Sequence, residues 1–169
     1  MGLRLARLAR GQDGRKIVPS TTAKSISSET TFNEDLNDVK ALEKHLWWLS
    51  EKTAKRCKAK DVAGNTVVLK MKADRSSSLT RSASLPDPTQ LADVMFEKGS
   101  QLLRQVMAEH PGQKFRLIGI GVSGLADAQL ADPPDLADPD KARRKAAENA
   151  MDNLRDKFGD GSIKKGRSL

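Results

Sequence analysis

The amino-acid sequence predicts an α+β domain in which two helices cover one face of a β-sheet. Two long segments between residues 24 and 125 carry apolar residues at helical spacing, and shorter β-prone segments lie before, between and after them. The chain has 169 residues, of which 37% are apolar, so it can build one domain with a modest core. We therefore expect a compact middle region with looser ends.

Four segments are predicted strands: residues 24–32, 67–72, 79–85 and 115–122. The first is rich in Ser and Thr and ends in Phe32, a composition typical of strands. In the second, Val67, Leu69 and Met71 alternate with polar or less buried positions, which predicts a half-buried strand with a wet, basic face. The third ends at a Pro-Asp-Pro turn. The fourth is a dense apolar run, which indicates a strand through the middle of the sheet.

Two helices are predicted, over residues 35–60 and from an N-cap at Thr89 to about His110. Apolar residues recur at three- and four-residue steps in the first helix: Leu36, Val39, Leu42, Leu46, Leu49, Thr53 and Cys57. The second helix has a similar stripe: Leu91, Val94, Met95, Leu102, Val106 and Met107. Trp47 and Trp48 lie in the middle of the first helix, and at least one of them is expected in the core.

The resulting order is strand, helix, strand, strand, helix, strand, which is the ferredoxin-like β-α-β-β-α-β arrangement. It implies a four-stranded antiparallel sheet with both helices on one face. The opposite face would be free to meet a ligand, although the fold alone does not identify that ligand.

The C-terminal third differs in composition from the rest. Residues 126–140 contain five Asp, three Pro and no basic residue, which indicates a linker. Residues 141–169 are predicted to form a flexible, basic, helical tail with a thin apolar face at Ala147, Ala150, Met151, Leu154 and Phe158. We expect this tail to be a solvated surface element, and contact with DNA is the alternative.

The charge balance favours a polyanionic partner. Thirty Lys and Arg against 22 Asp and Glu give a formal charge of +8. A single cysteine, Cys57, excludes an internal disulfide. Because the sequence holds only two histidines, His45 and His110, which are far apart, a zinc site is not expected. No apolar run approaches the roughly 20 residues needed to cross a bilayer, so we expect no membrane partner and a cytoplasmic location.

Five segments in a fixed order resemble bacterial DNA polymerase IV, a Y-family translesion DNA polymerase: residues 9–19, 24–32, 66–70, 79–82 and 116–123. The resemblance covers about residues 3–125. It implies that residues 1–19 are the end of the thumb domain with its tether and that residues 20–125 are the little finger domain. In that family the little finger lies against the DNA backbone, so we expect sequence-independent binding of template-primer DNA.

Binding to phosphates requires short hydroxyl side chains and a few cations. The expected DNA-binding residues are Lys24, Ser25, Ser27, Lys70, Thr80, Arg81, Ser82 and Arg116. Arg81 and Arg116 are the strongest candidates, and the alternative is that they pair with acids such as Glu29 on neighbouring strands. Glu29 itself is interpreted as orienting a nearby Arg or Lys, or else as a solvent-facing strand residue.

Catalysis is not expected of this chain by itself. Nucleotidyl transfer needs metal ions held by clustered carboxylates, and no such cluster is recognisable, because the five aspartates lie in a proline-broken linker. We therefore expect no cofactor here, and Mg²⁺ only in a catalytic domain that the chain lacks.

Two other functions remain open. Members of the family commonly dock on the replication sliding clamp through a short peptide often ending Asp-Leu-Phe, but Asp135 and Leu136 are followed here by Ala137, without the aromatic anchor. The chain could still be an interaction module that recruits the clamp through its tail. A small ferredoxin-like acyl-phosphate hydrolase would need an arginine anion cradle and a positioned amide, and no such loop stands out.

Overall fold

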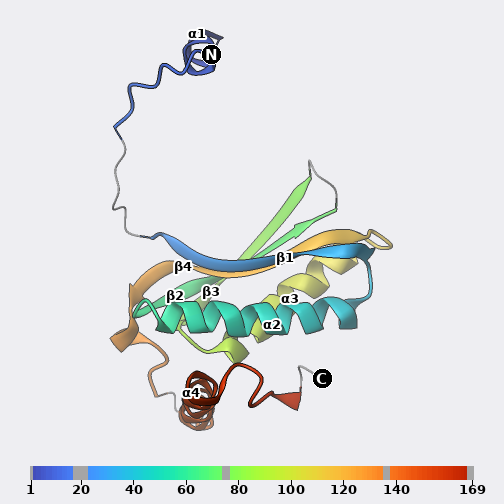
Figure 1. Cartoon of the computed structure of the whole chain (residues 1–169). Coiled ribbons are helices and arrows are strands. Elements are labelled where there is room, and N and C mark those ends of the chain that lie inside the picture. The colour runs from blue at the N-terminus through green and yellow to red at the C-terminus, as the bar shows by residue number, and fades with distance from the viewer. Residues whose placement is uncertain (1, 17–22, 74–76, 135–137, 167–169) are drawn as a thin grey trace.

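The computed structural model describes residues 2–16, 23–73, 77–134 and 138–166. A four-stranded antiparallel sheet lies on two helices, and a further helix packs beneath them (Figure 1). The elements, in chain order, are α1 (Gly2–Ala9), β1 (Ser25–Leu36), α2 (Val39–Lys58), β2 (Val62–Lys72), β3 (Ser78–Thr89), α3 (Ala92–Glu109), β4 (Phe115–Asp127), the short 3₁₀ helix η1 (Ala128–Leu130) and α4 (Lys141–Phe158).

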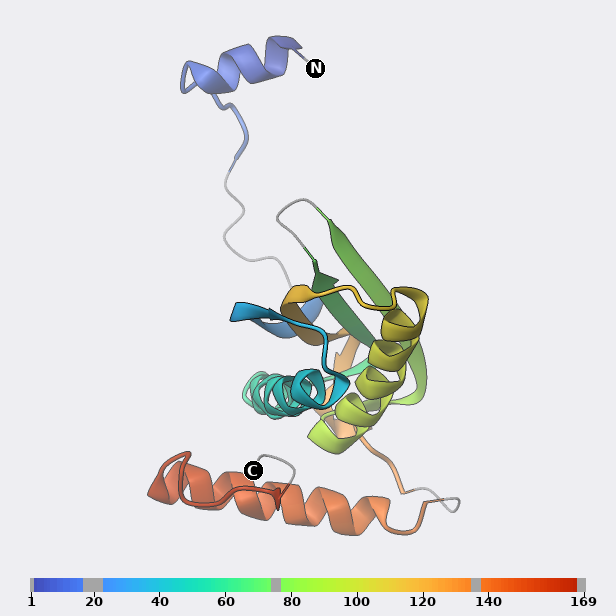
Figure 2. The ribbon, with the colours of Figure 1, turned by 90° about the vertical axis from the view of Figure 1, so that its right-hand side faces the viewer.

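The predicted β-α-β-β-α-β order and the placement of α2 and α3 on one face are confirmed (Figure 2). The strand order across the sheet is β1-β4-β2-β3, so β4 runs through the middle, as its apolar run predicts. This order makes β2 and β4 the central strands, whereas the same two strands lie at the edges of a ferredoxin sheet. The fold class is therefore as expected, and the pairing of the strands is a variant of it.

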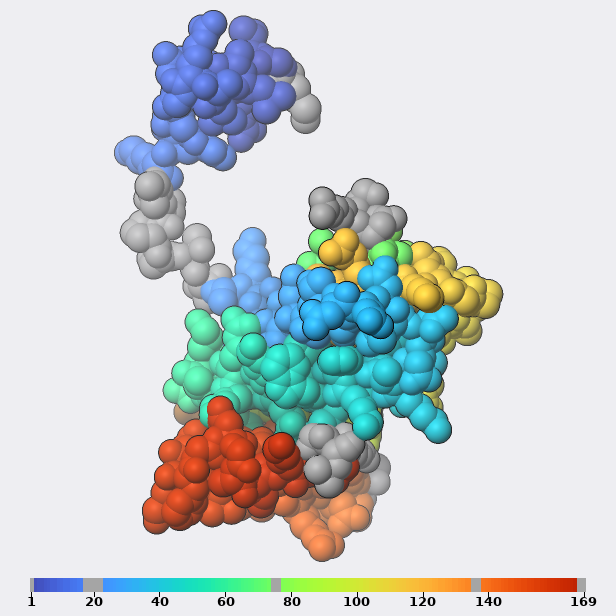
Figure 3. Space-filling model, turned by 45° about the vertical axis from the view of Figure 1, so that its right-hand side comes forward, coloured from blue at the N-terminus to red at the C-terminus, as the bar shows by residue number. Residues whose placement is uncertain are grey.

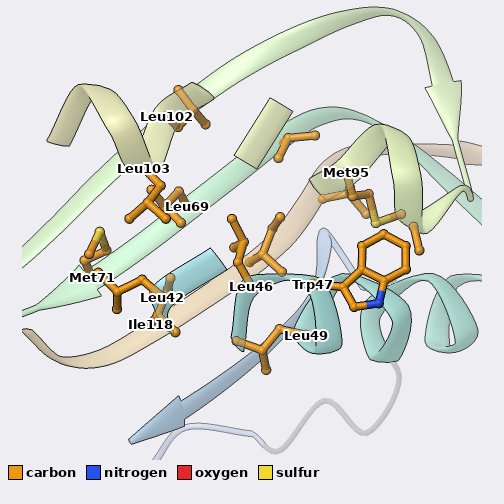
Figure 4. Close-up of a cluster of buried hydrophobic side chains, with 14 of the residues drawn as sticks. Leu42, Leu46, Trp47, Leu49, Leu69, Met71, Met95, Leu102, Leu103 and Ile118 are labelled. Carbon is orange, nitrogen blue, oxygen red and sulfur yellow. The ribbon is translucent and has the colours of Figure 1, made fainter. Parts of the chain in front are cut away.

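The core lies between the sheet and the two helices. Helix α2 begins at Asp38, whose carboxylate accepts a hydrogen bond of 2.8 Å from the Ala41 amide. Its predicted stripe is buried from Leu42 to Cys57, and Leu42 and Leu46 face β-strand residues such as Leu69 and Ile118 (Figure 4). Trp47 is also buried, whereas Trp48 is half exposed, which confirms that one of the two is in the core.

Several predicted element ends are displaced: β1 continues to Leu36, α2 begins only at Val39, β2 begins already at Val62 and β4 continues to Asp127. The ends of β3 and α3 differ as well. Strand β3 continues past Pro86 and Pro88 to Thr89, because it is an edge strand and proline there need not donate to a neighbour. The N-cap of α3 is Leu91 rather than Thr89. Thr89 lies two residues before this N-cap, and its hydroxyl accepts a hydrogen bond of 3.0 Å from the Leu91 amide.

Helix α1 stands apart from the sheet (Figures 1 and 2) and buries none of its residues. Leu3 and Leu5 on this helix are largely exposed. The resemblance assigns this segment to the end of another domain, and an uncovered apolar helix is consistent with such an assignment.

The tail is docked on the domain, contrary to the flexible segment expected from its composition. Strand β4 runs on to Asp127, and Asp132 is buried, accepting hydrogen bonds from the Thr89 hydroxyl at 2.6 Å and the Gln90 amide at 3.0 Å. Helix α4 then packs against α2 and α3 on the side away from the sheet (Figure 3). Its predicted apolar face does not make this contact, because Leu154 and Phe158 are exposed.

The thiol of Cys57 is expected to be unreactive in the folded protein. Burial raises the pKa of the Cys57 thiol to about 11, and the side chain is fully enclosed. At pH 8 only about one thiol in a thousand would be the reactive thiolate. A disulfide-exchange reagent such as DTNB should therefore label Cys57 only after unfolding in denaturant, and rapid labelling under native conditions would contradict this burial.

Candidate nucleic-acid interface

The face of the sheet opposite α2 and α3 is open and carries mainly small hydroxyl side chains. Strand alternation turns Ile26, Val67, Leu69 and Ile120 towards the helices, so the residues between them point away. The open face, named so from here on, carries these polar residues: Ser25, Ser27, Glu29 and Thr31 on β1; Ser123 on β4; Thr66, Lys70 and Lys72 on β2; Ser78, Thr80, Ser82 and Ser84 on β3.

The floor of the open face is bare backbone at β4. Gly119 and Gly121 lie between Lys70 and Val68 on β2 and the β1 residues opposite. A Cβ atom on Gly121 would lie 2.5 Å from the Ser27 Cβ and 2.7 Å from the Ile26 carbonyl oxygen, so no larger residue fits there without moving β1. The result is a shallow hollow of about 290 Å³ between β1 and the β2–β3 hairpin. Such a surface can approach a ligand's backbone closely.

Lys70 and Glu29 form an ion pair across this floor. The Lys70 Nζ lies 2.8 Å from a Glu29 carboxylate oxygen, and both residues pair in register with Gly119 on the strand between them. The expectation that Glu29 orients a nearby cation is confirmed, and the cation is Lys70. Both side chains are half exposed, so the Lys70 ammonium keeps access to solvent and to an incoming anion.

Five of the predicted site residues meet on the open face and line its hollow or its rim: Ser25, Ser27, Lys70, Thr80 and Ser82. Lys24 is exposed directly before β1. These six residues form one continuous surface across β1, β2 and β3, and the hydroxyl groups outnumber the cations.

Arg81, one of the two strongest candidates from the sequence, does not lie on the open face. It pairs in register with the buried Leu69, so alternation turns it to the helix side. There its guanidinium lies 2.5 Å from a Glu109 carboxylate oxygen on α3. The alternative of an ion pair with an acid is therefore the one observed, with Glu109 in place of Glu29.

Arg116, the other strong candidate, is half exposed near the start of β4. Its neighbours Phe115 and Ile118 both lie in the core although they are three residues apart, and the register of β1 against β4 shifts next to them. Strand alternation therefore does not assign Arg116 to either face.

Several surface residues of this site were missed from the sequence. The alternation of Gly119 and Gly121 with apolar neighbours is a period-two signal that would have predicted a bare face on β4. Arg56 reaches from α2 to donate a hydrogen bond to the Ser27 carbonyl at the free edge of β1, which places a cation beside the rim. No local sequence signal predicts that contact, because it joins residues of different elements.

The tail leaves the open face uncovered. Helix α4 crosses beneath α2, at the bottom of the molecule in Figure 1, and it and the segment after it are drawn in orange to red in Figure 3. Residues 135–137, where a clamp-binding peptide was considered, lie outside the described residues.

Within the described ranges no three His, Cys, Asp or Glu side chains are grouped so as to hold a metal ion. No described helix is long and apolar enough to span a membrane.

Comparison with known proteins agrees with this geometry. Residues 23–154 match the model of the impB/mucB/samB family C-terminal domain. A DNA polymerase IV of Brucella melitensis is 50% identical over 166 residues, covering 98% of this chain and 37% of that protein. One from Caulobacter vibrioides is 42% identical over 168 residues, covering 99% of this chain and 41% of the relative. The chain thus spans well under half the length of these relatives.

Solved structures show the same fold. A chimera of the Y-family DNA polymerases Dbh and Dpo4 aligns with a TM-score of 0.55 at 17% identity, covering 74% of this chain and 35% of the chimera. A post-insertion binary complex of Dbh DNA polymerase gives a TM-score of 0.55 at 14% identity, with the same two coverages. The family match, which covers most of the chain, shows that the chain belongs to the impB/mucB/samB family and comprises its C-terminal domain.

Proposed function

We propose that the open face holds the sugar–phosphate backbone of template-primer DNA, as the DNA-gripping part of a longer DNA-directed DNA polymerase. The chain covers only 37% of its Brucella relative, so the nucleotidyl transfer itself belongs to the remaining part of such a protein. A polymerase of this kind would act on damaged chromosomal DNA in the cytoplasm. The domain would contribute grip and alignment and no chemistry of its own.

The uncovered hollow between β1 and the β2–β3 hairpin is the observation that carries this proposal. Hydroxyl groups such as those of Ser27 and Thr80 can donate to phosphate oxygens without reading base identity. The glycines of β4 let a backbone approach closely, and Lys70 supplies a positioned positive charge. Among the described residues, the open face carries mainly short hydroxyl side chains and no helix or loop that would enter a groove, so affinity should be largely independent of sequence.

Binding is expected to depend on salt with a modest slope. Among the described residues, Lys24 directly before β1 and Lys70 and Lys72 on the open face could neutralise about three phosphates. The logarithm of the association constant should then fall with the logarithm of salt concentration with a slope of about −3. Fluorescence anisotropy with several unrelated duplexes measures both properties. A slope near zero, or a large preference for one sequence, would rule out backbone gripping by this face.

A further inference from the structure

A second basic surface lies on α2, on a different side of the domain from the open face. The last three turns of α2 and the residues after them carry five cations and no acid between residues 52 and 60: Lys52, Lys55, Arg56, Lys58 and Lys60. A strip of this density on a helix is typical of a site that attracts polyanions. In this structure two of the five, Lys55 and Lys58, are occupied by the chain's own tail.

The tail meets this strip with an acidic stripe. Four carboxylates occur at four-residue steps along α4 and just beyond it: Glu148, Asp152, Asp156 and Asp160. Such a spacing places them on one helical face, about 6 Å apart along the axis. Lys58 Nζ lies 2.9 Å from Glu148 and 2.7 Å from Asp152, and Lys55 Nζ lies 3.3 Å from Asp156 and 3.0 Å from Asp160.

The reverse pairing also occurs, with acids on α2 and α3 facing bases of the tail. Glu51, the carboxylate of α2 that borders the basic strip, lies 2.9 Å from the Arg155 guanidinium of α4. Lys165, after α4, lies 3.2 Å from Asp93 on α3. Acid therefore faces base at each of these positions, which indicates that the tail recognises this surface through charge.

Apolar burial contributes little to the docking. Glu148 is the only buried residue of α4, all of which the structure describes, and Leu154 and Phe158 point into solvent. The carboxylates of Asp160 and Asp156 raise the pKa of Lys55. For Lys58, burial acts to lower the pKa, but the charges of Glu148 and Asp152 outweigh it and the pKa is raised. At such a contact the carboxylates of the tail compete directly with other anions for the two lysines.

We propose that the basic strip of α2 is a second binding surface for the phosphodiester backbone of nucleic acid, and that the acidic stripe of the tail masks it by occupying Lys55 and Lys58. The carboxylates stand in for phosphates. While the tail is docked, Lys55 and Lys58 are withheld from nucleic acid. When the stripe is neutralised or displaced, the strip becomes available. This proposal does not depend on the function of the open face, because the two masked lysines, Lys55 and Lys58, lie on α2 and on no strand of that face.

The test compares two variants with the same change in net charge. The unmasked variant combines Asp152→Asn, Asp156→Asn and Asp160→Asn. The control variant combines Glu34→Gln, Asp35→Asn and Glu97→Gln, three exposed acids away from α4. The probe is a short mixed-sequence DNA duplex at low salt. The unmasked variant should bind several times more tightly than the control variant. Its salt slope should be steeper by about one, because Lys55 loses both of its carboxylates whereas Lys58 loses Asp152 and keeps Glu148.

Removal of the released lysines gives the decisive comparison. Adding Lys55→Gln and Lys58→Gln to the unmasked variant should return the affinity and the slope to those of the control variant. In the otherwise unchanged chain the same two substitutions should alter DNA affinity less than about twofold, because those lysines are already paired. The proposal is overturned if the gain equals that of the control variant, if it survives loss of both lysines, or if the intact chain already depends on them. Circular dichroism spectra that match the wild type establish that each variant is folded.

Discussion

The variant Lys70→Glu is expected to bind duplex DNA at least about tenfold more weakly than the wild type at low salt. The substitution changes the charge of the open face by two units. It also places two carboxylates side by side, because in the wild-type protein the Glu29 carboxylate lies 2.8 Å from the Lys70 ammonium. Phosphates approaching the hollow would meet repulsion in place of a positioned cation. Fluorescence anisotropy over a range of salt concentrations should show the largest loss at the lowest salt.

The matched control for this change is Lys98→Glu, on α3 and away from the open face. It alters net charge equally but should change DNA affinity only through long-range repulsion, by less than about threefold at moderate salt. Thermal unfolding should hardly change in Lys70→Glu, since a half-exposed pair contributes only about 0–1 kcal/mol. Equal losses of affinity for the two variants would mean that DNA responds to net charge and does not contact Lys70.

Substitution of the β4 glycines is expected to give a graded loss of stability. In Gly121→Ala the new Cβ would meet the Ser27 Cβ at 2.5 Å and the Ile26 carbonyl oxygen at 2.7 Å, so β1 must move. We expect a loss of about 1–3 kcal/mol in the free energy of unfolding. Gly119→Ala should cost less, because its closest contact is the Glu29 Cβ at 2.8 Å and the nearest backbone atom is at 3.3 Å.

Gly161→Ala is the matched control for this series, because no atom lies within 4 Å of the added Cβ. It should change stability by less than about 0.5 kcal/mol. Urea titrations of the three variants give the comparison directly. Equal stability of Gly121→Ala and Gly161→Ala would contradict both the close packing of β1 against β4 and the bare floor of the hollow. Gly121→Ala should also weaken DNA binding, since it raises that floor.

The sequence predicted the fold well where periodicity was strong. The stripe from Leu42 to Cys57 identified α2, and the apolar run around Ile120 identified a central strand. The strand order was beyond reach, because alternation determines which residues face the core but not which strands become neighbours. The β1–β4 and β2–β4 pairings join segments far apart in the chain, so no local pattern encodes them.

For the candidate site as well, the sequence predicted some residues correctly and others not. The hydroxyl residues Ser27, Thr80 and Ser82 were predicted from the chemistry of phosphate binding and from the family resemblance, and the structure places all three on the open face. Arg81 was predicted at the site from its charge and the family resemblance, but in the structure it lies on the same side of β3 as Leu79, Ala83 and Leu85. A long side chain can lie on a buried face if its charged end reaches an acid at the rim, and Glu109 provides that acid.

The docked tail was missed for a different reason. Its helix was predicted, but the tail was expected to be a flexible, solvated surface element. The sequence of α4 alone does not reveal the basic strip that its carboxylates meet. Glu148 is buried and accepts a hydrogen bond of 3.1 Å from the Ala92 amide at the start of α3. Contacts of this kind depend on two surfaces at once and therefore require the structure.

Amide chemical shifts during a titration with template-primer DNA test the central claim most directly. A ¹⁵N-labelled chain gives separate signals for the amides of Gly119 and Gly121 on the floor of the hollow. We predict that these two signals, with those of Ser27 and Thr80, shift progressively and with the same affinity, while the amides of α3 hold their positions. Shifts confined to the helical side, with the β4 glycines unchanged under saturating DNA, would contradict the account.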